Sequence, residues 1–168
     1  MFVGDEVLLS VSFAVARERL AQLTEGGVLI SASENAYGHG TAGLAAVGTR
    51  GLAKLVRVQV RELTWTDESA GLAIRWEAGG PDGTPFPVLD ADIRLTRAGE
   101  QGTLLSVAGV YRPPFGLTGR SLERSILDRV AAITVSNFTV SVAERIAGRP
   151  GPAEAASSNG AGAAPPSA

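Results

Sequence analysis

Hydrophobic and polar residues alternate along the middle of the chain. Four runs share this period of two: Val56, Val58 and Val60; Leu72, Ile74 and Trp76; Leu89, Ala91, Ile93 and Leu95; and Leu105, Val107, Gly109 and Tyr111. Side chains two residues apart lie on the same face of a strand, so each run predicts a strand with one apolar face. Turn-forming residues occupy Gly79–Gly83 and Arg97–Gly99 between runs. Linkers this short predict antiparallel neighbours joined by hairpins.

The sequence before these runs predicts one strand followed by two helices. Residues Val7–Phe13 alternate in hydrophobicity, with Val7, Leu9, Val11 and Phe13 as the more apolar set. From Ala14 the apolar spacing changes to three and four residues, which is typical of a helix, until Gly26 and Gly27 end it. Val28–Leu44 predicts a second helix, although it contains Gly38, Gly40 and Gly43, which weaken helices.

A long amphipathic helix is predicted over Gly119–Ala147, after Pro113 and Pro114 end the last strand. Its apolar residues form one broad stripe: Leu122, Ile126, Leu127, Val130, Ile133, Phe138, Val142 and Ile146. Such a stripe needs an apolar partner, and the apolar face of the sheet is the large one available. We therefore predict one α+β domain over residues 1–147. Residues 148–168, rich in Gly, Ala, Pro and Ser, are expected to form a disordered tail.

The other face of the predicted sheet is charged. It carries both signs on neighbouring strands: Arg57, Arg61, Arg75 and Arg94 beside Glu77, Asp90 and Asp92. Opposite charges across adjacent strands are typical of a face turned to water. We interpret these carboxylates as an exposed charge ladder rather than as catalytic acids.

Composition excludes several classes of function. The chain has a net charge of −2, which gives no electrostatic reason to expect a nucleic-acid partner. It contains no cysteine, so disulfides and thiolate metal sites are excluded. The apolar run Val7–Phe13 is too short to span a bilayer. Asp5 and Glu6 stand where a secretory signal would have basic residues, so we expect a cytoplasmic protein without an integral membrane segment.

Several segments resemble the START-like helix-grip superfamily, called SRPBCC, which includes polyketide cyclases/dehydratases and lipid-transfer domains. The resemblance rests on short stretches: Ser33–Tyr37, Ile74–Ala78, Phe86–Asp92 and Gly109–Pro114. They look like an uncharacterised bacterial branch, and the likeness covers residues 3–147. It implies a helix-grip fold, in which a curved antiparallel sheet wraps around the long C-terminal helix and leaves a cavity between them.

Strand parity names the side chains that would line such a cavity. They are Val58, Val60, Leu72, Ile74, Trp76, Ala91, Ile93, Val107 and Tyr111. Apolar walls with a few polar groups are typical of a small-molecule pocket. The Tyr111 hydroxyl would either orient a ligand or bond to backbone while the ring packs. Asn137 offers a further polar contact from the long helix, unless it lies on the exposed helix face.

Candidate catalytic groups are few. His39, the single histidine, is either a general base at the pocket mouth or a surface residue in a glycine-rich turn. One histidine without cysteine gives no metal site. Gly38, Gly40 and Gly43 spell GxGxxG, but inside a helical stretch rather than after a strand, so no dinucleotide or other cofactor is expected.

Three functions fit these patterns. The first is sequestration or carriage of a small hydrophobic, lipid-like or polycyclic ligand. The second is polyketide cyclase or dehydratase chemistry in the same pocket, with Tyr111 and His39 as the residues to move protons. The third is a protein-interaction module whose groove holds an apolar segment of a partner. The ligand and the oligomeric state do not follow from the sequence.

Overall fold

The computed structural model describes residues 1–25, 27–45, 55–79, 85–112 and 121–148. Its elements, in chain order, are β1 (Phe2–Leu9), α1 (Phe13–Glu25), α2 (Val28–Ala45), β2 (Leu55–Trp65), β3 (Ser69–Gly79), β4 (Pro85–Arg97), β5 (Thr103–Arg112) and α3 (Ser121–Ile146). This is the predicted order of one strand, two helices, a run of strands and a long helix. The tail predicted from residue 148 lies, apart from Gly148, outside the described residues.

Within these ranges, five strands form one antiparallel sheet in the order β1-β5-β4-β3-β2. Hairpins join β2 to β3, β3 to β4 and β4 to β5, whereas β1 comes from the far end of the sequence to pair with β5. The register places Ile93 opposite Leu72 on one side and opposite Val107 on the other. β1 and β2 are therefore the two edges of the sheet.

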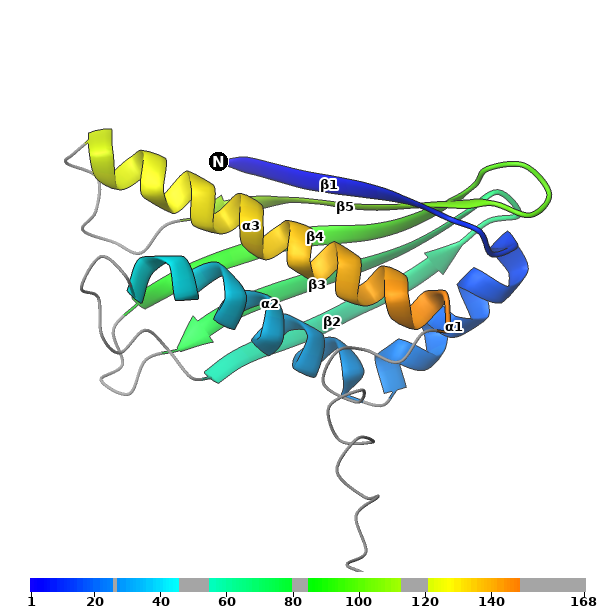
Figure 1. Ribbon diagram of the computed structural model, residues 1–168. Helices are drawn as coiled ribbons and strands as arrows, with labels where there is room; N and C mark the ends of the chain where they lie inside the picture. The colour runs from blue at the N-terminus through cyan, green and yellow to red at the C-terminus, as the bar shows by residue number, and fades with distance from the viewer. Residues whose placement is uncertain (26, 46–54, 80–84, 113–120, 149–168) are drawn as a thin grey trace, which may run out of the picture.

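The helices cover one face of this sheet. α3 crosses that face and contacts β1 and β5, while α2 packs against α3 and β2 (Figure 1). α1 lies across one end of the strands, where the guanidinium of Arg97 is 5.3 Å from the centre of the Phe13 ring. The core forms between the helix layer and the covered face, which we call the inner face. The architecture is the α+β helix-grip fold that the sequence predicts.

The first strand differs from its prediction. It begins at Phe2 and ends at Leu9, so Val11 and Phe13 do not belong to it. The carbonyl of Ser12 accepts a hydrogen bond from the amide of Ala16 at 2.9 Å, which makes Ser12 the N-cap and Phe13 the first residue of α1. The alternation of Val7–Phe13 therefore spans the end of a strand and the start of a helix, both of which turn apolar side chains to the core.

Candidate functional site

The predicted lining residues share the inner face. The register aligns Tyr111, Leu89, Trp76 and Val58 in one row across the sheet, and neighbouring rows carry the rest. Trp76 is 3% exposed and Ile93 is fully buried, so the parity prediction places these side chains correctly. Val58 is half-buried, and Val60 is 38% exposed because it lies on the edge strand β2. As ligand contacts, all nine stay predictions.

The two ends of the inner face are packed differently. A side chain that borders a space wide enough for water keeps some accessible surface. Ile93 keeps none, and Leu72 and Val107 keep almost none, so the end of the sheet near α1 is solidly packed. Tyr111 at the opposite end is 8% exposed, and Ala91 also keeps some surface. The side chains around Ile93 are thus fully enclosed, and those at the Tyr111 end, which we call the looser end, are slightly more accessible.

A glycine allows β4 and β5 to approach closely at the looser end. Gly109 lies opposite Ala91 in the register. A Cβ at Gly109 would overlap the backbone oxygen of Asp90 and lie 2.7 Å from the Cβ of Ala91. No side chain fits there, so the strand pair requires glycine at this position.

α3 presents one aromatic ring and one hydroxyl group above this region. The rings of Phe138 and Trp76 pack with centroids 5.6 Å apart. Thr134 lies one turn before Phe138 on the same side of the helix. It is 6% exposed, and its Oγ1 has no hydrogen-bond partner among the residues that the structure describes. By contrast, the buried hydroxyl of Thr139 donates to the carbonyl of Val135 at 2.9 Å, the usual solution inside a helix.

Thr134 was not among the sequence-predicted site residues, because a helical threonine normally satisfies its own hydroxyl. Asn137, which the sequence analysis did propose as a polar contact, is half-buried on α3. Asp5 was also missed: it lies on the inner face at the β1 edge, opposite Val107, and its Oδ1 accepts the amide of Glu6 at 3.0 Å. The backbone of His39 lies within α2 rather than in a turn, and its side chain falls outside the described residues.

The outer face carries the predicted charge ladder. Arg75 contacts Glu77 at 2.7 Å and Asp90 at 3.4 Å, and Arg112 contacts Asp90 at 2.8 Å. The hydrogen bond that Arg75 donates to Glu77, followed by the charge of Asp90, raises the pKa of Arg75 above its ordinary value. These carboxylates lie on the opposite side of the sheet from the core, so they are not part of an inner-face site.

Asp90→Asn tests this assignment. Partly exposed ion pairs contribute little to stability, so we expect the Tm to fall by no more than about 3 °C. Ligand binding at the inner face should not change. A loss of binding in a chain that keeps its Tm would contradict the structural role of Asp90. Differential scanning calorimetry and a binding titration on the same sample measure both effects.

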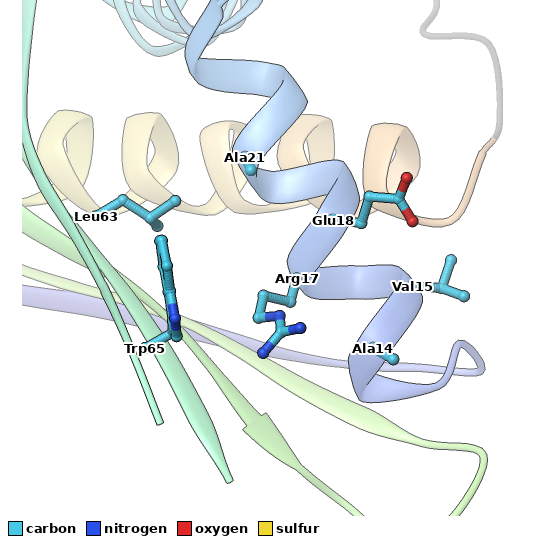
Figure 2. Close-up of a pocket in the computed structure, with 7 residues that line it drawn as sticks. All are labelled: Ala14, Val15, Arg17, Glu18, Ala21, Leu63 and Trp65. Atoms are coloured by element: carbon cyan, nitrogen blue, oxygen red, sulfur yellow. The ribbon is translucent and has the colours of Figure 1, made fainter. Parts of the chain in front are cut away.

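An open groove lies apart from the inner-face residues, between α1 and the end of β2 (Figure 2). Its volume is about 490 Å³, and it is lined by Ala14, Val15, Arg17, Glu18, Ala21, Leu63 and Trp65. None of the nine predicted lining residues belongs to it. Trp65 is the last residue of β2, and 61% of its surface is exposed.

The described ranges contain no group of three or more His, Cys, Asp or Glu side chains that could hold a metal ion. In those same ranges, every helix is too short or too polar to cross a membrane.

No protein-family model and no curated protein sequence matches the chain. Several solved structures do match it. A conserved protein from Geobacillus kaustophilus superposes with a TM-score of 0.51 at 16% identity, covering 86% of this chain and 94% of that one. A START superfamily protein from Mycobacterium smegmatis gives 0.39 at 12% identity, covering 86% and 96%. The Zhui aromatase/cyclase from a Streptomyces species gives 0.36 at 12% identity, covering 87% and 95%. The likeness to the Geobacillus kaustophilus protein, at 16% identity, concerns the fold alone.

Proposed function

We propose that this domain binds a small hydrophobic molecule between the inner face of its sheet and α3, at the end marked by Trp76, Tyr111 and Thr134. A cytoplasmic location and a single ligand-binding domain over residues 1–147 belong to the same proposal. The function is sequestration or carriage, because the described part of the inner face presents aromatic and aliphatic side chains rather than a set of converging acids and bases.

The hydroxyl of Thr134 is the observation that carries the proposal. A buried hydroxyl without a partner costs about 1–3 kcal/mol. A threonine on this helix can avoid the cost, because the hydroxyl of Thr139 donates a hydrogen bond to the carbonyl of Val135. A hydroxyl left available one turn from Phe138 supplies the polar contact that an otherwise apolar pocket needs to orient its ligand. The greater accessibility of Tyr111 and Ala91 supports a ligand site at the same end of the sheet.

Thr134→Val tests the proposal, because valine keeps the shape and removes the hydroxyl. We expect the free energy of unfolding to rise by about 1 kcal/mol, since the unpartnered group is gone. We also expect the affinity for N-phenyl-1-naphthylamine, an uncharged apolar fluorophore with one N–H group, to fall about fivefold through loss of one hydrogen bond. Urea unfolding and fluorescence titration measure the two quantities.

Thr139→Val is the matched control on the same helix. Its hydroxyl is satisfied within α3, so its removal should not stabilise the chain and should leave the fluorophore affinity unchanged. Equal effects of the two substitutions would contradict the proposal. So would a wild-type chain that shows no saturable uptake of the fluorophore and carries no apolar molecule in native mass spectrometry after purification.

A further inference from the structure

The groove between α1 and β2 contains an arginine that has no partner among the described residues. Arg17 makes no hydrogen bond or ion pair within the described part of the chain. Other arginines nearby are engaged: Arg19 donates to the carbonyl of Ile146 at 2.7 Å, and Arg97 contacts Glu68 at 3.2 Å. Figure 2 shows the Arg17 side chain on the side of α1 that faces Trp65, while the Glu18 carboxylate points away. A cation is thus available inside the groove.

The opposite wall of the groove is an exposed aromatic ring. After the register shift in β2, Trp65 still lies on the same side of the sheet as the inner-face residues. It is exposed because it lies at the end of an edge strand, beyond the helix layer. Leu63 beside it is half-buried against the core, and Ala14 and Ala21 form the small-residue surface of α1. The groove therefore combines an indole face, an apolar floor and one free guanidinium.

We propose that this groove is a second ligand site, which binds a small planar aromatic carboxylate. The volume of about 490 Å³ lies in the range of small-molecule pockets. The indole offers a stacking surface, the apolar floor takes the hydrocarbon edge, and the guanidinium pairs with a carboxylate through two parallel hydrogen bonds. The described lining offers one guanidinium to pair with an anionic group, so the expected ligand is a monoanion.

This site is independent of the proposed function. It shares no residue with the inner-face site, and its ligand is charged whereas the inner-face ligand is apolar. The two tryptophans of the chain separate the sites experimentally, because Trp65 lies in the groove and Trp76 is buried on the inner face. In a ¹H–¹⁵N spectrum, their two indole N–H signals report one site each.

Titration of the full chain with 2-naphthoate tests the inference. We expect the Trp65 indole signal to shift saturably while the Trp76 signal stays in place. Arg17→Ala should weaken binding roughly tenfold, and the uncharged 2-naphthamide should bind the wild-type chain about that much more weakly than 2-naphthoate. Arg17→Lys keeps the charge but loses the planar pair of donors, so it should give an intermediate affinity.

Arg94→Ala is the matched control, because Arg94 is an exposed arginine on the outer face. The Arg94→Ala chain should bind 2-naphthoate with the affinity of the wild type. The inference is overturned if the Trp65 signal does not move up to millimolar 2-naphthoate, or if Arg17→Ala and Arg94→Ala behave alike. A shift of Trp76 without Trp65 would also overturn it and would support the inner-face site. A Trp65 signal that depends on protein concentration without ligand would instead assign the groove to self-association.

Discussion

Gly109→Ala should lower the free energy of unfolding by about 3 kcal/mol, although it adds a single methyl group. The new Cβ would overlap the backbone oxygen of Asp90 and crowd Ala91, and neither contact can be relieved by rotating a side chain. β4 and β5 would have to separate, which strains the hydrogen bonds on both sides of the pair. Urea unfolding followed by far-UV circular dichroism measures the change.

Gly71→Ala provides the control for this substitution. Gly71 also lies inside a strand, but its nearest neighbour would be the Oγ1 of Thr64 at 3.3 Å, a side-chain atom that can move. We expect a change within about 0.5 kcal/mol, because alanine is also the better strand former. Similar losses for the two variants would show that the loss of glycine flexibility, rather than the approach of β4 to β5, determines the effect.

Phe138→Ala should lower the free energy of unfolding by about 3–5 kcal/mol, the largest effect that we expect from a single substitution. Phe138 is fully buried and packs on Trp76, so its removal deletes a contact between α3 and the sheet. Trp76 emission should shift to the red in a Trp65→Phe background, which removes the signal of the exposed indole.

Val140→Ala is the control on the same helix. Val140 is largely exposed, and alanine favours helices, so the free energy of unfolding should change by less than about 0.5 kcal/mol. Benzene should partly restore the Tm of Phe138→Ala and should leave that of Val140→Ala unchanged, because apolar cavities bind it. A Phe138→Ala chain with wild-type stability would mean that α3 does not depend on this ring for its contact with the sheet.

The sequence predicted the strands well because their period of two is strong. Every second residue from Leu72 to Trp76 and from Leu89 to Leu95 is buried, as a period of two requires. The resemblance supplied the arrangement of the helices, which periodicity alone does not. The error at the first strand arose because Ser12 caps a helix within an alternating run, and alternation over so few residues does not separate a strand from a helix start.

The candidate sites were harder to predict, for reasons specific to each residue. Val60 has the inner-face parity of its strand, but its exposure depends on β2 being an edge, which is a property of the strand order. Thr134 becomes informative only when its hydroxyl is found without the bond that Thr139 makes. Arg17 and Trp65 line the same groove because α1 crosses the end of the sheet. No local pattern in either segment predicts that arrangement.

The pairing of β1 with β5 also bears on how the chain folds. Phe2 pairs with Val110, so the N-terminal strand must wait until β5 has left the ribosome. Contacts between such distant segments carry a large loop-closure entropy and slow the folding of a domain. The three hairpins from β2 to β5 can form first, and β1 then adds to an edge that already exists. During synthesis, β1 is therefore the strand that stays unpaired longest and is most exposed to pairing with the wrong chain.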